Sequence, residues 1–392
     1  MTPKKKILFI HHGSGWGGAP NSLIKTIKEL DTAKYDVLVL LIKDSIVRKK
    51  LEEIGINYIV ARSFFYRKIY SFYFHWVPYY VPFYYFPKFF KLSLFWLLSR
   101  FYFAKRELKH LDYDIAHLNS SQISDWLAPC KKKGKVVMHI REPISKGTFG
   151  FRYTLFRSQM RKYCDKIIAI SFDNAKRIDL PEKTSVVYNF SEVNNNFVKE
   201  DSYFSKKVLY LGGSAPYKGF HNMVNALEFL DNDIKVYFGG IYDSQEENEF
   251  KFKIKKILGI GSDLRKTLRK MRQSHKTIEL GLIFNVTKYI GESCCLIAPF
   301  AASHFARPVI EAYLNKKPAI GTNVEGMDEI ITQNYTGLIV KNENGRALAD
   351  AINYLCNHPI KAREMGENGF KLATEKFTCE NVKQIISIYD SL

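Results

Sequence analysis

A single carboxylate, Glu311, lies about one turn inside a helix predicted to begin near Pro308, in the stretch SHFARPVIEAYLNKKPAIGT (303–322). Proline at the first helical position is typical of a helix start, and the amides of that first turn attract an anion. An ionised carboxylate accepts two hydrogen bonds, so it suits a pair of neighbouring hydroxyls. The alternative is that Glu311 is merely favourable near a helix N-terminus.

Two glycine-rich stretches, 13–18 and 212–213, each follow a predicted strand directly. Backbone amides in such turns can approach a phosphate closely, although glycine also marks ordinary strand-to-helix turns. Neither stretch matches the dinucleotide or P-loop fingerprint. Lys218 follows the second stretch, where an ammonium would neutralise charge on a departing phosphate. The alternative for Lys218 is a solvated loop lysine.

A third group of polar residues ends the strand in HIREP (139–143). His139, Arg141 and Glu142 would lie at the carboxyl end of a parallel sheet, where ligands bind. A structural salt bridge around Arg141 and Glu142 is the alternative. No carboxylate pair has a spacing convincing for a hydrolase, and no His/Cys/Asp cluster indicates a metal. We therefore expect neither a metal ion nor a cofactor.

The elements that position these residues are near-continuous apolar runs separated by helical segments, which predict parallel sheets covered on both faces. The fold class is α/β, with two Rossmann-like doubly wound domains facing across a cleft. We expect an N-terminal domain over 1–190, a linker over 191–206, a C-terminal domain over 207–375 and a last helix over 376–392 that packs back on the N-terminal domain. The predicted strands are 6–10, 35–42, 56–61, 113–119, 135–140, 165–171, 184–190, 207–213, 233–240, 276–283, 294–300, 317–322 and 336–341.

With these motifs in place, the chain resembles the family 4 glycosyltransferases, which have the GT-B fold. The segment FARPVIEAYLNKKPAIGTNVEGMDEII followed by TGLIV resembles their donor-binding segment. YLGGSAPYKGF resembles their Gly-Arg-x-x-x-x-Lys-Gly segment, and GSGWGGAPNSL resembles their N-terminal Gly-Gly-Ala loop. The strands IIAIS and VVYNF also resemble family strands. The resemblance covers most of the chain except residues 64–104.

The resemblance implies a nucleotide-sugar donor held by the C-terminal domain, a glycan or lipid-linked acceptor approached from the N-terminal domain, and transfer with retention. It places Glu311 on the donor ribose and Lys218 on the diphosphate. The expected catalytic residues are Lys218, Glu311, His139 and Glu142. The expected donor-binding residues are Gly17, Gly18, Gly212, Gly213, Lys218, Ser303, Phe305, Ala306, Arg307 and Glu311.

Two positions depart from the family pattern. Ser303 stands where the family usually has its first Glu, and Gly213 stands where it has an arginine. Three interpretations follow from Ser303. The donor contact is altered, Glu142 supplies the contact across the closed cleft, or the enzyme is poorly active. We favour the altered contact, because the surrounding motif is kept.

The insert at 64–104 is rich in Phe, Tyr, Trp and cations and holds no acid, and three prolines interrupt it. Aromatic and cationic side chains suit the interface of an anionic membrane. We expect membrane contact through Trp76, Phe83 and Trp96. One alternative is a helical pair packed on its own domain. Another is a platform for single-stranded nucleic acid, but no RRM, KH or OB signature is present, so no nucleic-acid partner is expected.

The bulk composition fits these expectations. The formal net charge is +20, which points to an anionic partner. The six cysteines have no disulfide-framework spacing, and Cys294 and Cys295 lie in a buried apolar run. No signal peptide or ordinary transmembrane helix is indicated. We expect a cytoplasmic protein, peripheral on the inner face of the plasma membrane, with a catalytically silent sugar- or partner-binding homologue as the alternative function.

Overall fold

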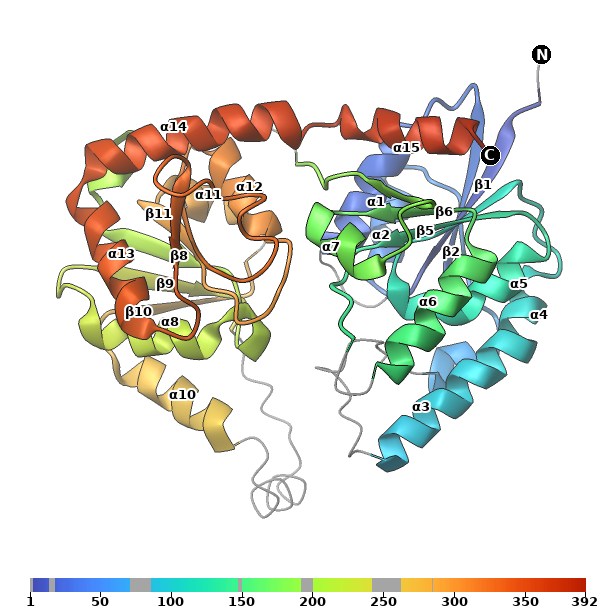
Figure 1. Ribbon diagram of the computed structural model, residues 1–392, viewed down its shortest axis with the longest axis horizontal. Coiled ribbons are helices and arrows are strands. Elements are labelled where there is room, and N and C mark those ends of the chain that lie inside the picture. Colours follow the sequence, from blue (N-terminus) through green and yellow to red (C-terminus); the bar gives the residue numbers. More distant parts are fainter. Residues whose placement is uncertain are drawn as a thin grey trace. The chain divides into compact units, whose positions relative to one another are not determined.

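The apolar runs form two parallel sheets in the computed structural model (Figure 1), which describes residues 3–13, 18–70, 86–146, 150–191, 200–241, 262–283 and 285–392. The chain divides into two compact units. Unit 1 comprises Met1–Asn189 and Cys379–Leu392, and unit 2 comprises Phe190–Thr378. The predicted α/β class with two doubly wound domains is confirmed.

Unit 1 contains a seven-stranded parallel sheet in the order β3-β2-β1-β4-β5-β6-β7. Along the central strands, neighbouring residues belong to different hydrophobic clusters. In the first strand, Ile7 and Phe9 belong to one cluster and Leu8 and Ile10 to another. Both faces are therefore buried, which explains the unbroken apolar runs. The strands are β1 (Lys5–His11), β2 (Tyr35–Leu41), β3 (Tyr58–Val60), β4 (Ile115–Leu118), β5 (Lys135–Ile140), β6 (Lys166–Ala169) and β7 (Thr184–Val186).

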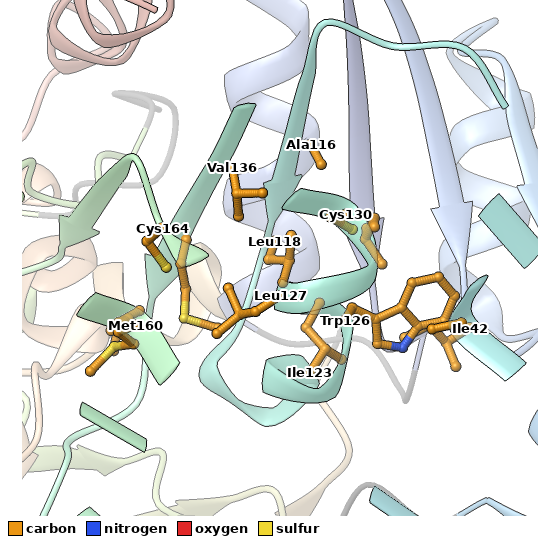
Figure 2. Packing of buried hydrophobic residues seen from close by; sticks show 14 of the residues in the cluster. Ile42, Ala116, Leu118, Ile123, Trp126, Leu127, Cys130, Val136, Met160 and Cys164 are labelled. Atoms are coloured by element: carbon orange, nitrogen blue, oxygen red, sulfur yellow. The ribbon is translucent and has the colours of Figure 1, made fainter. Parts of the chain in front are cut away.

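Helices cover both faces of this sheet (Figure 1). Figure 2 shows one face, where Leu118 and Val136 from the sheet gather with Trp126 and Leu127. The last helix packs on the other face, and the Tyr389 hydroxyl lies 2.6 Å from His117 Nδ1. The helices are α1 (Gly18–Lys28), α2 (Ile46–Glu53), η3 (Ser121–Trp126), α5 (Leu127–Lys131), α6 (Phe151–Tyr163), α7 (Phe172–Ile178) and α15 (Asn381–Asp390).

Unit 2 contains a six-stranded parallel sheet in the order β10-β9-β8-β11-β12-β13. Its strands are β8 (Lys207–Tyr210), β9 (Lys235–Gly239), β10 (Thr277–Gly281), β11 (Cys295–Ala298), β12 (Ala319–Thr322) and β13 (Gly337–Val340). Its helices are η5 (Glu200–Phe204), η6 (Pro216–Lys218), α8 (Phe220–Ala226), η7 (Leu227–Phe229), α10 (Ser262–Gln273), α11 (Val286–Gly291), α12 (Arg307–Leu314), α13 (Gly345–Asn357) and α14 (Pro359–Lys376).

The end of the predicted linker belongs to unit 2. The short helix η5 buries Ser202 and Tyr203. The fully buried Lys317 donates to the Ser202 hydroxyl, and its ammonium lies 3.7 Å from the centre of the Tyr203 ring. A buried ammonium needs such partners, because removing it from water is costly. Residues 192–199 of the linker lie outside the described residues.

The insert forms η1 (Phe65–Ile69) and a helical run of α3 (Phe86–Leu98), η2 (Ser99–Phe103) and α4 (Ala104–Leu108). Among the described residues, no helix has both the length and the apolar character needed to cross a membrane. Trp96 is 8% exposed, and its indole donates to the Ser124 hydroxyl at 3.1 Å. The prediction that Trp96 contacts a membrane is therefore wrong, because this face of α3 packs on unit 1. Trp76 and Phe83 lie outside the described residues.

Asp125 ties the insert to the sheet of unit 1. Its Oδ2 accepts hydrogen bonds from Tyr70, directly after η1, at 2.9 Å and from Ser99 at the start of η2. The carboxyl is fully buried, and burial raises its pKa to about 6 from the usual 3.8. The hydrogen bonds from Ser99 and Tyr70 oppose this rise without cancelling it.

The raised pKa predicts a pH-dependent contribution to stability. Because the folded-state pKa exceeds the unfolded-state value, the contribution is complete below about pH 4 and is lost as the pH rises through about 6. A shift of about two units corresponds to about 3 kcal/mol. We measure the free energy of unfolding of wild type and of Asp125→Asn at each pH and subtract the second from the first. This difference should fall by about this amount between pH 4 and pH 7.

Tryptophan fluorescence during urea unfolding measures this difference in unit 1, since all four tryptophans lie within residues 1–189. The buried histidines titrate in both proteins, so their contribution cancels in the difference. Asp36→Asn removes an exposed carboxylate from the same unit and controls for the loss of a charge. A wild-type-minus-Asp125→Asn difference that does not change with pH would contradict the assignment.

Candidate functional site

The first half of the candidate site is the turn between β8 and α8. Gly213 has a φ of +60°, and its amide donates to the Gly239 carbonyl at 3.1 Å. A Cβ at Gly212 would lie 2.1 Å from the Tyr210 hydroxyl, and one at Gly213 would lie 2.8 Å from the Gly240 carbonyl oxygen. Close packing within unit 2 thus requires both glycines. Their role in donor binding stays a prediction.

The turn then meets the loop that follows β11. Gly219 has a φ of +78°, and a Cβ there would lie 1.6 Å from the Pro299 carbonyl oxygen. The Ala301 amide also donates to the Tyr217 carbonyl at 3.0 Å. These two constraints fix Lys218 beside the loop that leads into α12. Lys218 and Glu311, which the sequence singled out separately, therefore belong to one site.

Lys218 and Arg307 are two cations of this site. Lys218 is partly buried, and burial lowers the pKa of its ammonium. The Arg307 guanidinium lowers that pKa further. An anion between the two groups would reverse both effects, because it would replace lost hydration and offset the repulsion. Two cations arranged in this way suit an anion between them.

Glu311 lies on the same helix as Arg307, one turn further on. Their side chains form an ion pair of 3.3 Å, and the exposed fractions of the two side chains are 27% for Arg307 and 20% for Glu311. No other partner of the Glu311 carboxylate occurs among the described residues. Its second oxygen therefore remains able to accept a hydrogen bond from a ligand.

The start of α12 explains why Arg307 and Glu311 share a face. Ala306 precedes the helix and has no side chain that could cap it, and a proline follows at the start of the helix. The opposite face buries Val309, Ile310 and Tyr313. Burial of that face directs Glu311 away from the core. Ala306 itself is fully buried, so any contact it makes with a donor is through its backbone.

The loop before α12 contains both predicted and unpredicted residues. The Ser303 hydroxyl donates to the Glu325 carbonyl at 2.8 Å. The Phe305 ring is 8% exposed and packs edge-on against Phe377 at 6.1 Å, so Phe305 anchors the loop. Its role in donor binding stays a prediction. Sequence reasoning missed His304, whose ring stacks on Phe300 at 4.9 Å. Its position directly after Ser303 was the available signal.

Unit 1 holds a separate buried cluster around Arg141, at the end of β5. The guanidinium donates to Asn119 at 2.9 Å, to Ser22 at 2.8 Å and to Asn189 at 2.8 Å. All three acceptors are uncharged side-chain oxygens. The predicted alternative of a salt bridge between Arg141 and Glu142 is not what these contacts show.

Arg141 also determines the tautomer of His139. The His139 Nδ1 lies 3.2 Å from Arg141 Nη2, which can only donate, so Nδ1 must be the acceptor. Burial, together with Arg141, lowers the pKa of His139 well below its usual value, which keeps the ring neutral. The proton is therefore on Nε2, which has no partner among the described residues. His139 can thus donate a hydrogen bond from Nε2 but cannot accept a proton there.

The same reasoning applies to His11 on β1. Because Asn119 accepts from Arg141 through Oδ1, its Nδ2 faces His11 Nδ1 at 3.2 Å and donates to it. His11 is also buried with a strongly lowered pKa, and its Nε2 has no partner among the described residues. Arg141 therefore determines the tautomers of both His139 and His11, so that each ring carries its proton on Nε2. The sequence motifs, taken separately, did not reveal this link.

Glu142 has a structural task in this conformation. Its carboxylate accepts from the Ser120 hydroxyl at 2.5 Å, from the Ser121 hydroxyl at 2.8 Å and from the Ser121 amide at 3.1 Å. These bonds fix the start of η3. Its assignment as a catalytic acid stays a prediction, and three existing hydrogen bonds argue against it as a substitute for the acid absent at Ser303.

The remaining predicted residues lie in the glycine loop of unit 1. Gly18 is the exposed first residue of α1, and a Cβ there would meet nothing within 4 Å. Gly17 lies outside the described residues. Within the described part of the chain, no group of three or more His, Cys, Asp or Glu residues could hold a metal ion.

Comparison with known proteins finds similarity to glycosyltransferases. The model of the family described as glycosyl transferases group 1 matches residues 194–372. An uncharacterized glycosyltransferase of Methanocaldococcus jannaschii is 25% identical over 63% of this chain and 64% of its own length. A capsular polysaccharide biosynthesis glycosyltransferase of Staphylococcus aureus is 20% identical over 66% of this chain and 63% of its own. The chain thus matches less than two thirds of the length of these relatives.

Solved structures agree on the fold. The Anabaena protein HepE, solved with UDP and glucose, superposes with a TM-score of 0.75 at 18% identity, covering 99% of this chain and 100% of that one. A sucrose-phosphate synthase of Thermosynechococcus elongatus superposes with a TM-score of 0.71 at 17% identity, covering 99% of each chain. The chain therefore has the GT-B fold, and its residues 194–372 match the glycosyl transferases group 1.

Proposed function

We propose that the protein transfers a sugar from a nucleotide-diphosphate donor to a glycan or lipid-linked acceptor, with retention and without a metal ion. The observation that carries the proposal is the cation pair of unit 2, in which burial and Arg307 both lower the pKa of Lys218. A diphosphate would offset this repulsion. The structure of HepE with UDP-glucose supports a donor of this class, and an O-antigen chain mannosyltransferase of Escherichia coli is among the relatives.

The chemistry follows from where charge develops. As the bond from the sugar to the diphosphate breaks, negative charge grows on the leaving phosphate oxygen. A partly desolvated ammonium at Lys218 stabilises that charge more strongly than a solvated one. Glu311 accepts hydrogen bonds from the donor ribose through its open oxygen and holds Arg307 over the same site. Binding of the nucleotide and stabilisation of the leaving group thus depend on different side chains.

Ser303 supports a donor contact that differs from the family's usual one. Its hydroxyl is occupied by the Glu325 carbonyl, and it holds the loop rather than presenting a charge. The neighbouring His304 imidazole then takes part in the sugar contact. The surrounding Arg307 and Glu311 are kept, which argues against a decayed site. If the enzyme acts at the inner face of the plasma membrane, a lipid-linked acceptor would be available to it there.

A thermal-shift screen tests the proposed function. The full chain is mixed with UDP-, GDP-, ADP- and CMP-sugars, and one class should raise the melting temperature. A ligand at 100 times its dissociation constant stabilises by about 2.7 kcal/mol. Transfer or hydrolysis of the selected donor is then measured. A donor that binds but is never turned over with any glycan or lipid-linked acceptor would favour a silent sugar-binding homologue.

The Glu311→Gln variant tests the ribose contact. It keeps the shape of the side chain but loses its charge, so donor affinity should fall by about 1.5–3 kcal/mol, the contribution of hydrogen bonds to a charged group. Isothermal titration calorimetry measures it. Glu375→Gln, which neutralises an exposed carboxylate on α14 of the same unit, is the control and should change affinity little. Unchanged donor affinity in Glu311→Gln would refute the ribose contact.

The Lys218→Ala variant tests leaving-group stabilisation. Turnover at saturating donor should fall by about 10²–10³-fold, as on loss of one electrostatic donor at a transition state. Lys371→Ala removes an exposed lysine of the same unit and should leave turnover unchanged. If the rate of a correctly folded Lys218→Ala protein stays within a few-fold of wild type, Lys218 is a loop lysine without a catalytic role.

A further inference from the structure

The helical run Phe86–Leu108 is apolar on two opposite faces. One face buries Leu92, Phe95 and Trp96 in unit 1. The other face exposes four large apolar residues at intervals of four, three and four, which is the spacing of one helical stripe. We call this set the outer stripe: Phe90 is 64% exposed, Leu94 43%, Leu97 44% and Phe101 60%.

A pocket of about 1120 Å³ adjoins the end of the outer stripe, where β3 and η1 face η2 and α4. Its lining includes Phe101 of the outer stripe, so the two features form one continuous surface. Exposed Phe64 and Tyr102 add further apolar area at the pocket. Cations line the same pocket, and we call them the pocket cations: Arg62, Lys105, Arg106 and Lys109.

The pocket cations have no ion pair with a carboxylate among the described residues. The acid that lines the pocket is Glu107, and its two oxygens already accept from the backbone amides of Arg62 and Ser63, at 2.9 and 2.8 Å. The Lys105 ammonium lies 5.7 Å from the centre of the Phe101 ring. The four cations outnumber the one carboxylate of the pocket, and this excess produces a positive potential that attracts anions.

We propose that this surface docks the protein on an anionic phospholipid leaflet, with the outer stripe among the upper acyl chains and the pocket cations on lipid phosphates. The proposal rests on the proposed function in that a lipid-linked acceptor would be met at this leaflet. In this proposal Phe90, Leu97 and Phe101 contact the membrane, whereas the sequence predicts that contact for Trp96, which is buried. Apolar side chains beside cations match the layered chemistry of a bilayer interface.

Two other occupants fit the surface less well. A second copy of this chain would place stripe against stripe and bring the two sets of pocket cations near each other, where they would repel. Single-stranded nucleic acid stacks its bases on aromatic rings, but half of the outer stripe is leucine, which offers no ring. Both occupants are outcomes of the test below.

The test is co-sedimentation of the full chain with vesicles at low salt. Wild type should bind vesicles of phosphatidylglycerol mixed with phosphatidylcholine, bind pure phosphatidylcholine weakly, and release from the anionic vesicles in 0.5 M salt. Lys105→Glu with Lys109→Glu should weaken binding to anionic vesicles by more than about tenfold, since each cation near an anionic surface contributes to binding. Phe90→Ser with Leu97→Ser should also reduce binding, with the pocket charge unchanged.

Matched controls separate this surface from general charge and hydrophobicity. Lys49→Glu reverses an exposed lysine on α2 of the same unit, and Ile360→Ser removes an 81% exposed isoleucine on α14. Both should bind vesicles like wild type, and circular dichroism confirms that every variant is folded. Equal losses in the control and pocket variants would show attraction by net charge alone and would overturn the proposal.

Three further outcomes would also overturn it. These are no sedimentation of wild type with anionic vesicles, tighter binding to an oligonucleotide than to vesicles, and a concentration-dependent dimer that is lost in the Phe90→Ser, Leu97→Ser variant. Donor binding is measured without vesicles, so the two proposals fail separately. A protein that binds a donor but no vesicle refutes only the docking surface, and one that binds vesicles but no donor refutes only the proposed function.

Discussion

The close approach of two loops in unit 2 is the constraint on which the candidate site depends. At Gly219 a positive φ and a carbonyl oxygen 1.6 Å from any added Cβ leave room for glycine alone. That contact brings the turn after β8 against the loop after β11, and the bond from the Ala301 amide to the Tyr217 carbonyl holds it there. Lys218 therefore becomes a neighbour of Arg307, although the two lie far apart in the sequence.

In unit 1, the buried guanidinium of Arg141 donates to the uncharged side chains of Asn119, Ser22 and Asn189. Arg141 keeps His139 neutral, orients Asn119 and through it orients His11. Polar groups are rarely buried without partners, so the two Nε2 donors, which have no partner in the part of the chain that the structure describes, are a notable feature of this cluster.

The strands and the fold class were predictable, because a parallel sheet is buried on both faces and its strands are therefore continuous apolar runs. A run such as YDVLVLLI predicts such a strand by itself. The resemblance also directed attention to Lys218 and Glu311, which the structure brings to one unit. The burial of Trp96 was not predictable, because a helix that is apolar on both faces does not reveal which face packs.

Other contacts escaped prediction because they join residues distant in the chain. Glu142 satisfies its carboxylate with Ser120 and Ser121, and Phe305 packs on Phe377. Neither pairing leaves a local pattern in the sequence. The same holds for Asp125, which reads as an ordinary polar residue until Tyr70 and Ser99 are placed beside it.

The central claim is that Lys218 and Arg307 form a cation pair that accepts a diphosphate. The most direct measurement is the pKa of the Lys218 ammonium, followed by NMR of ¹³C-labelled lysine with and without bound nucleotide diphosphate. Because burial and Arg307 lower that pKa in the free protein, binding should raise it, and the protein should take up protons at alkaline pH. A Lys218 pKa that does not change when nucleotide diphosphate binds would contradict the account.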